Sequence, residues 1–165
     1  MYGSSQESLV GSGAVILTIP DPPTNFVEDY SKRSASTLGF TWKAPVQTGG
    51  TLLLDYQVEM ARAGSDYAVI ASALTSESYV ATGLTSGITY QFRVKARTEF
   101  GLSNESKLLS LLCAYKPEPP QAVYTSNDGK QVLVQWSNPV TNGSPITEYK
   151  IYVKKSQSNE LIQET

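Results

Sequence analysis

Apolar and polar residues alternate along several short stretches of this chain with the two-residue period of a β-strand. The clearest alternating apolar sets are Leu38, Phe40 and Trp42; Tyr56, Val58 and Met60; and Tyr90, Phe92, Val94 and Ala96. Successive side chains of a strand point to opposite faces, so each set predicts a strand with one buried face. No window carries a helical apolar stripe of about 10 residues or more, and we expect no substantial α-helix.

Seven short strands are predicted between Pro20 and Lys116. We expect them after Pro23, around Trp42, around Tyr56, and at 67–71, 78–81, 90–97 and 107–114. The connecting segments are rich in Gly, Pro, Ser and Asn, and glycine in the loops 48–50 and 99–101 accepts a positive φ at little cost. Short strands at this spacing predict an all-β fold, an antiparallel β-sandwich.

The sequence also repeats itself. The segment YGSSQES at 2–8 returns as FGLSNES at 100–106, and each copy leads to a proline cluster, at 20–23 and at 117–120. Trp42 and Pro45 match Trp136 and Pro139 at an offset of 94 residues, and the repeating unit from Pro20 to Lys116 is about 97 residues long. We therefore expect one complete unit at 20–116. The last strand of a preceding unit is expected at 1–19, and the N-terminal half of the next unit at 117–165.

The complete unit resembles the fibronectin type III family. The residues that carry the resemblance are the proline-rich start, Trp42, Tyr56, and the run GLTSGITYQFRVKA at 83–96 followed by Gly101 and Ser103. The resemblance implies an immunoglobulin-like, seven-stranded antiparallel sandwich, in which Leu84 and Tyr90 form a tyrosine corner whose hydroxyl holds the turn before the strand. The structural core is then expected to include Trp42, Tyr56, Leu84 and Tyr90, and in the partial unit Trp136 and Tyr149.

The chain also departs from the family pattern. Thr98 and Ser86 stand where the family often has asparagine and proline, and both are expected at exposed loop positions. The adhesive Arg-Gly-Asp tripeptide of one family member is absent from the loop at 98–104. Integrin binding is therefore not carried over to this chain.

Composition removes most catalytic chemistry. The chain has no histidine and a single cysteine, Cys113, which excludes Ser-His-Asp and Cys-His nucleophiles, an intrachain disulfide and a four-cysteine metal cluster. The net charge of −2 gives no attraction to nucleic acid, and no apolar run approaches the roughly 20 residues of a membrane helix. We expect no enzyme activity, no cofactor, no metal, no nucleic-acid partner and no membrane insertion within this segment. Cys113 is expected to act as a small hydrophobic residue.

Candidate binding residues lie on the last long strand and the turn after it. Arg93, Lys95 and Arg97 share its outward face and could bind an anionic glycan or a membrane surface. Pairing with Glu59 and Gln57 on a neighbouring strand is the more ordinary use of such a row. Phe100 and Leu102, in the turn, are candidate contacts for a protein partner.

Two short motifs bear on modification and metal binding. Asn104-Glu105-Ser106 is an N-glycosylation sequon, and Asn104 is expected to be exposed. It favours an extracellular or cell-surface setting over an intracellular cytoskeletal one, and the compartment stays open. The segment 126–129 contains the Asp-Gly pair of a tight hairpin and lacks the spaced carboxylates of a calcium loop.

These observations favour a non-catalytic structural or protein-interaction module. The chain would be part of a tandem array that serves as a spacer, scaffold or adhesion segment. A ligand-recognition ectodomain of a cell-surface receptor and an accessory domain of a larger enzyme are the alternatives. Because 117–165 would leave Trp136 and Tyr149 without covering strands, we expect a neighbouring repeat or another chain to complete that partial sandwich.

Overall fold

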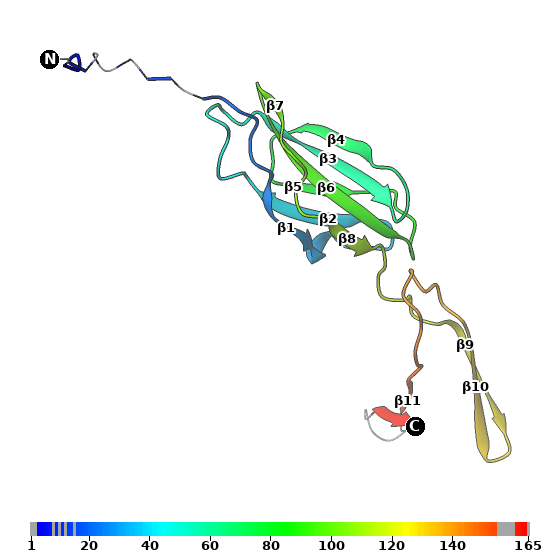
Figure 1. The fold of residues 1–165 in the computed structure, drawn as a ribbon. Helices are drawn as coiled ribbons and strands as arrows, with labels where there is room; N and C mark the ends of the chain where they lie inside the picture. The colour runs from blue at the N-terminus through cyan, green and yellow to red at the C-terminus, as the bar shows by residue number, and fades with distance from the viewer. Residues whose placement is uncertain are drawn as a thin grey trace.

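The computed structural model describes residues 3–7, 9, 11, 13–14, 16–154 and 161–164. A β-sandwich occupies the middle of the chain, an N-terminal segment runs away from one end, and a long hairpin lies beyond the other end (Figure 1). Within the described residues, helical structure is limited to the short 3-10 helix η1 (Tyr30–Lys32). The predicted all-β, antiparallel class is confirmed.

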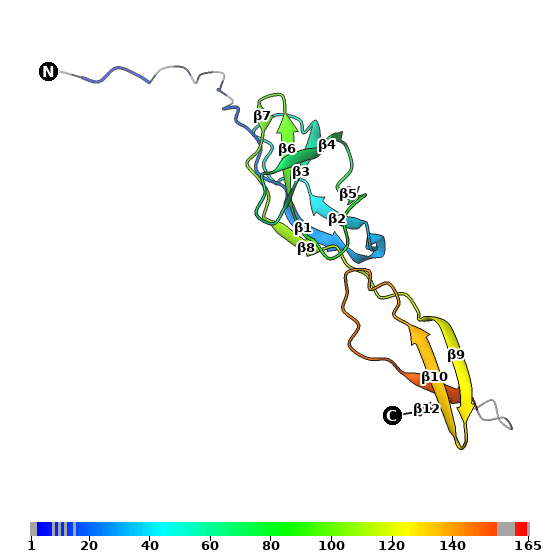
Figure 2. The same ribbon diagram turned by 90° about the vertical axis from the view of Figure 1, so that its right-hand side faces the viewer.

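The sandwich consists of two antiparallel sheets. One has the order β1 (Thr24–Asp29), β2 (Leu38–Lys43) and β5 (Ser78–Ala81). The other has the order β4 (Ala68–Leu74), β3 (Asp55–Arg62), β6 (Thr89–Thr98) and β7 (Gly101–Leu102), and β8 (Leu109–Leu112) also pairs with β6. The two sheets lie face to face (Figures 1 and 2). All seven predicted strands are present, and β7 is an additional two-residue strand.

The core forms where the alternating apolar faces of the two sheets meet. Phe40 of β2 and Phe92 of β6 are each 0% exposed, and their ring centroids lie 4.7 Å apart across the sandwich. The Trp42 ring contacts Tyr56 of the opposite sheet at 5.4 Å between centroids. Burying such large rings between two sheets is the main source of stability for a fold without disulfides.

The turn before β6 is held by the side chain of Tyr90. This residue is 2% exposed, and its hydroxyl oxygen accepts a hydrogen bond from the backbone N–H of Thr85 at 3.0 Å. Leu84 is also buried, and its N–H donates to the carbonyl oxygen of Ser36 at 3.0 Å. The turn is therefore attached both to β6 and to the loop that precedes β2.

The segment that follows the sandwich contains two hairpins. β9 (Gln121–Asp128) pairs with β10 (Gln131–Ser137), and β11 (Ile151–Lys154) pairs with β12 (Leu161–Glu164). Gly129 adopts a φ of 62° between β9 and β10, at the Asp-Gly pair that favoured a hairpin. The Trp136 and Tyr149 rings lie 5.2 Å apart, but Tyr149 is 39% exposed. Trp42 and Tyr56 are buried, but Trp136 and Tyr149 remain partly exposed, because no second sheet covers them in the described part of the chain.

The N-terminal segment differs from the expectation. We expected the last strand of a preceding unit at 1–19, but the described residues before Thr24 form no strand. A strand needs a partner for its backbone groups, and the hydrogen bonds that this segment makes through Thr18 and Asp21 go instead to the loop that follows β2.

Candidate functional site

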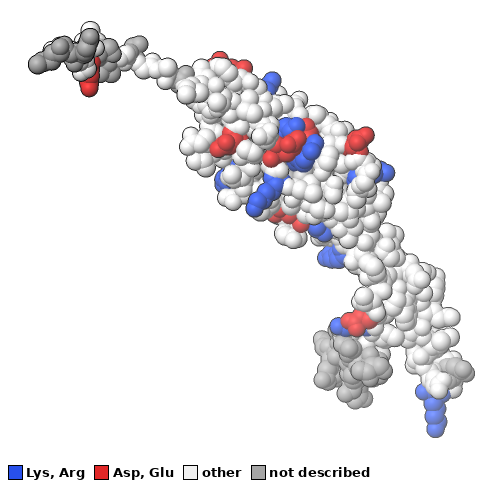
Figure 3. Space-filling view, viewed as in Figure 1, with Lys and Arg blue, Asp and Glu red and all other residues white. Residues whose placement is uncertain are grey.

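The outward face of β3 and β6 gathers most of the candidate charged residues. The register of these antiparallel strands places Asp55 opposite Arg97, Gln57 opposite Lys95 and Glu59 opposite Arg93. Directly opposed side chains on one face lie close enough to interact. We call this surface the charged face and define it by the following residues: Asp55, Glu59, Arg93, Lys95, Arg97 and Glu105. Acidic and basic side chains lie next to one another there (Figure 3).

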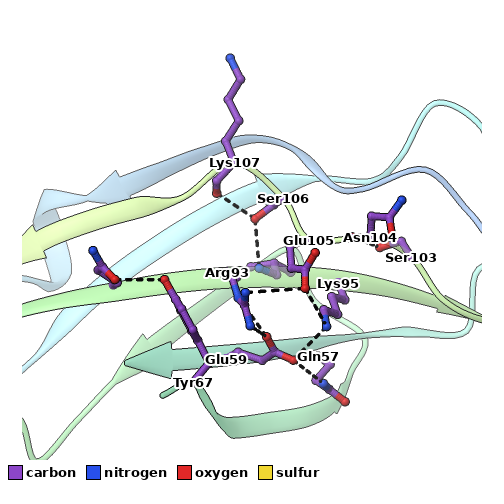
Figure 4. Close-up of polar contacts among 12 residues, drawn as sticks. Gln57, Glu59, Tyr67, Arg93, Lys95, Ser103, Asn104, Glu105, Ser106 and Lys107 are labelled. Carbon is purple, nitrogen blue, oxygen red and sulfur yellow. Dashed lines mark hydrogen bonds and ion pairs between the residues drawn. The ribbon is translucent and has the colours of Figure 1, made fainter. Parts of the chain in front are cut away.

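Glu59 lies at the centre of the charged face. Its Oε2 accepts hydrogen bonds from Nη2 and Nε of Arg93 at 2.6 and 3.1 Å, and its Oε1 lies 3.2 Å from Nζ of Lys95. Glu105 reaches the same two cations from the segment after β7, at 3.6 Å from Nη1 of Arg93 and 3.3 Å from Nζ of Lys95 (Figure 4). Two carboxylates therefore share two cations in a closed network.

The Arg93 side chain is also fixed by an aromatic ring. Its guanidinium carbon lies 3.6 Å from the centroid of the Tyr67 ring, which is a close cation–π contact. The Tyr67 hydroxyl in turn donates to the side-chain oxygen of Gln91 at 3.1 Å. Arg93 is thus held from one side by Glu59 and from another by Tyr67.

Burial and hydrogen bonding act in opposite directions on Glu59. Glu59 is only 7% exposed, and burial alone raises the pKa of a carboxyl group. The hydrogen bonds from Lys95 and Arg93, with their positive charges, outweigh this, so the pKa of Glu59 is lowered from its ordinary value of 4.5. Glu59 therefore carries its negative charge at neutral pH.

The third cation of the row has its own partner. Arg97 binds the Asp55 carboxylate with two nitrogens, and the Nε–Oδ1 distance is 2.8 Å. This hydrogen bonding raises the pKa of Arg97 above its ordinary value. Each of the three cations thus has a carboxylate partner within the domain, which is the cross-strand pairing described above. Asp55 was not singled out in the sequence, although its place two residues before Gln57 puts it on the same face.

The turn between β6 and β7 presents an exposed aromatic side chain. Phe100 is 45% exposed, whereas Leu102 is half-buried within β7. Thr98 was expected at an exposed loop position, and this was wrong, because β6 extends to Thr98 and its side chain is only 2% exposed. Its Oγ1 accepts a hydrogen bond from the N–H of Phe100 at 3.3 Å. Ser86 lies in an exposed turn, as expected.

Two buried serines hold the segment between β7 and β8 against β6. Ser103 and Ser106 each donate a backbone N–H to β6, to the carbonyl oxygens of Ala96 and Val94, at 2.8 and 2.9 Å. Each side-chain oxygen also accepts the N–H of the same β6 residue, at 3.0 Å in both cases. This role was not predicted from the sequence. The only signal was the pair of serines three positions apart, between two strands.

This geometry changes how the glycosylation sequon is interpreted. Asn104 is exposed, but Ser106, the serine of the sequon, is 8% exposed and its hydroxyl donates to the carbonyl oxygen of Lys107 at 3.0 Å (Figure 4). The serine therefore has a structural role in the folded domain whether or not Asn104 is modified.

Replacing Ser106 with alanine is expected to lower the free energy of unfolding by about 1–2 kcal/mol. The substitution leaves the buried N–H of Val94 without a side-chain acceptor, and an unsatisfied buried donor costs about this much. Urea denaturation measures the change. Ser110→Ala is the control on the same edge, because Ser110 is exposed, and it should change stability little. Equal losses in both variants would contradict the assigned role.

Metal-ligand clusters and membrane-spanning helices are both absent from the described residues. Within them, no group of three or more His, Cys, Asp or Glu side chains gathers in a metal-binding arrangement. No helix of the described chain has the length and apolar character to cross a membrane. Cys113 is 0% exposed, and burial raises the pKa of its thiol, which keeps it neutral.

The C-terminal segment, from Pro120 to Lys154, has an open apolar groove of about 380 Å³. Its walls come from β9, β10, β11 and the segment before β11, and the residues that correspond to the core of the complete unit are Val134, Trp136, Tyr149 and Ile151. In the complete unit, the same face is covered by aromatic side chains of the second sheet, such as Phe92.

Comparison with known proteins is consistent with this geometry. The profile of the fibronectin type III domain matches residues 21–111. The chain belongs to the fibronectin type III family. Domains of this family are generally non-catalytic. The match covers the two-sheet sandwich from the proline-rich start to β8.

Similar proteins include a fibronectin type III domain-containing protein, a striated-muscle M-protein and titin. The chain is 30% identical over 167 residues to the mouse (Mus musculus) fibronectin type-III domain-containing protein 3A, covering 96% of this chain and 14% of that protein. It is 27% identical over 168 residues to chicken (Gallus gallus) striated-muscle M-protein, covering 96% of this chain and 11% of that protein. A titin crystal structure superposes with a TM-score of 0.53 at 28% identity, over 58% of this chain and 32% of that chain. The chain thus spans a small part of the relatives that it matches.

Proposed function

We propose that this chain is a segment of a tandem fibronectin type III array that works as a spacer or scaffold for protein interactions. Residues 20–116 form the complete unit, and 1–19 and 117–165 belong to neighbouring units. The observation that carries the proposal is the charged face. There, Glu59, Glu105 and Asp55 form ion pairs with the three cations, and all partners lie within the same domain. A face whose charges are already paired suits a self-contained structural unit better than a site for a charged ligand.

The short linkers support the same proposal. Prolines at 20, 22 and 23 and at 117, 119 and 120 fix φ and restrict how neighbouring units can reorient. Small-angle X-ray scattering of a protein that contains several consecutive repeats tests this. We expect a maximum dimension that grows by a constant increment with each added repeat. A compact particle whose dimension grows far more slowly would overturn the spacer function.

A recognition function is the second candidate, and the exposed Phe100 favours it. An aromatic ring at the tip of a tight turn is a typical anchor for a protein partner. Once a partner is identified, Phe100→Ala should weaken binding by about tenfold or more. Unchanged binding would remove this turn from consideration. An accessory role beside a catalytic domain is the third candidate, and the complete coding sequence of the gene would test it.

The partial unit supports a proposal about partners. We expect the groove over Trp136 and Tyr149 to be covered by strands equivalent to β5 and β6, from the next part of the array or from another chain. The exposed glycan acceptor Asn104 and the extracellular setting that it favours also stay proposals. A mobility shift on glycosidase treatment of secreted protein, lost in Asn104→Gln, tests them.

A further inference from the structure

Two linkers of this chain make the same pair of backbone hydrogen bonds. The N–H groups of Thr18 and Asp21 donate to the carbonyl oxygens of Gly49 and Gln47, at 3.0 and 2.9 Å. In the second linker, the N–H groups of Tyr115 and Glu118 donate to the carbonyl oxygens of Asn142 and Val140, both at 2.9 Å. In both cases the donors are three positions apart and the acceptors two. We call this pair of bonds the linker–loop clamp.

The loop of each clamp has the same unusual backbone. Gly49 and Gly50 have φ values of 73° and 86°, and Asn142 and Gly143 have values of 51° and 77°. Two consecutive residues in the left-handed region turn the loop sharply, and glycine and asparagine are the residues that tolerate this best. The turn brings the loop carbonyl groups to the linker. The sequence pattern predicted only a loop at residues 48–50.

The second clamp adds side-chain bonds to the linker. The Asn142 amide nitrogen lies 3.0 Å from the carbonyl oxygen of Lys116 and 3.0 Å from Oε1 of Glu118. The linker backbone and the loop are therefore joined both by main-chain and by side-chain hydrogen bonds.

The second clamp also contacts the body of the preceding domain. A Cβ atom on Gly143 would collide with the backbone nitrogen of Gly87 and would lie 3.0 Å from the carbonyl oxygen of Cys113. That part of the domain is itself fixed, because Gly87 N–H donates to Cys113 at 2.8 Å and Cys113 N–H donates to Ile88 at 2.9 Å. Backbone on both sides leaves no flexible side chain that could move aside.

We propose that consecutive repeats of this chain recognise each other through the loop that the clamp holds and the turn of the preceding repeat that this loop contacts. The turn at Gly87 in one repeat receives the loop at Asn142 and Gly143 of the next, and the paired linker sets the angle between them. The bonds are made by backbone groups and by residues without a bulky side chain, so the arrangement can recur although the linker sequences differ. This inference rests on the proposed function as a tandem array.

The test measures the orientation of the two units in the whole 165-residue protein. Residual dipolar couplings are collected for amides of 20–114 and of 117–154 in the wild type, in Gly143→Ala and in Gly129→Ala. Gly129 also has a positive φ, 62°, but nothing lies within 4 Å of its Cβ position. The control therefore carries the same backbone strain without a contact to the preceding domain.

We expect one shared alignment tensor in the wild type and in Gly129→Ala. In Gly143→Ala the two units should give different tensors, and the exchange protection of the Tyr115 and Glu118 amides should fall by about tenfold or more. A shared tensor that persists in Gly143→Ala, or two tensors in the wild type, would overturn the clamp.

A second variant covers the case in which Gly143→Ala disturbs the second unit as a whole. Asn142→Gly keeps the backbone conformation accessible and removes only the bonds to Lys116 and Glu118. It should lower the protection of the Glu118 amide while the β9–β10 amides keep theirs, and unchanged protection would count against the clamp. The scattering experiment distinguishes failure of the clamp from failure of the proposed spacer function. An extended array whose repeats are oriented independently would refute the clamp and leave the spacer function standing.

Discussion

Replacing Trp42 with alanine is expected to lower the free energy of unfolding of the complete domain by about 3–5 kcal/mol. The ring is 1% exposed, and it contacts the Phe26, Phe40 and Tyr56 rings at centroid distances of 6.3, 6.3 and 5.4 Å. Its indole nitrogen is buried with no hydrogen-bond partner among the described residues, so the loss is one of packing. Urea denaturation followed by circular dichroism measures it.

Trp136→Ala is the matched control. Trp136 is the equivalent residue of the second unit, but it is only half-buried beside the open groove. Its removal should change the main unfolding transition by about 1 kcal/mol or less, since little buried area is lost there. Trp42→Phe keeps an aromatic ring, so its loss of unfolding free energy should fall between those of the other two variants. This variant can be measured even if the Trp42→Ala protein does not fold. Similar losses for Trp42→Ala and Trp136→Ala would contradict the difference in burial.

The strands of the complete unit could be predicted because both of their faces are specified locally. In β6, Tyr90, Phe92 and Val94 alternate with Gln91, Arg93 and Lys95, and the buried and outward positions follow this order. A one-residue shift would move every side chain to the wrong face, so the pattern determines the register as well as the strand. The same reasoning placed Glu59 next to the basic row.

Other features depend on contacts that a local pattern does not contain. Ser103 and Ser106 satisfy backbone groups of β6 only because the segment after β7 returns beside it. Residues 48–50 are predicted as a loop, but the turns at Gly49 and Asn142 bind linkers about 30 residues away in the chain, which no local pattern indicates. The burial of Trp136 likewise depends on strands outside its own hairpin. Local patterns specify which residues are buried in an element, and tertiary contacts decide which element covers them.

The second large effect is expected at Glu59. Glu59→Gln should lower the free energy of unfolding by about 2–3 kcal/mol, because it removes the buried negative charge that both Arg93 and Lys95 contact. The two cations would then face each other with Glu105 as their remaining carboxylate. Glutamine has nearly the same shape, so packing against the strand is kept. Urea denaturation at neutral pH measures the change.

Glu105→Gln is the matched control, since Glu105 contacts the same two cations but its side chain is 42% exposed. Exposed ion pairs contribute about 1 kcal/mol or less, so this variant should lose much less. A loss of unfolding free energy as large as that of Glu59→Gln would show that burial does not explain the contribution of Glu59 to stability.

The pH dependence gives an independent check on Glu59. Its folded pKa lies below the ordinary value of 4.5 that the unfolded chain has, so the unfolded state takes up protons first as the pH falls. The stabilisation from Glu59 is therefore fully present above 4.5 and is lost as the pH falls through the folded pKa. Glu59→Gln has no such group, and its stability should decline less steeply than that of the wild type in this range. Parallel declines in the two proteins would mean that the Glu59 charge does not stabilise the domain.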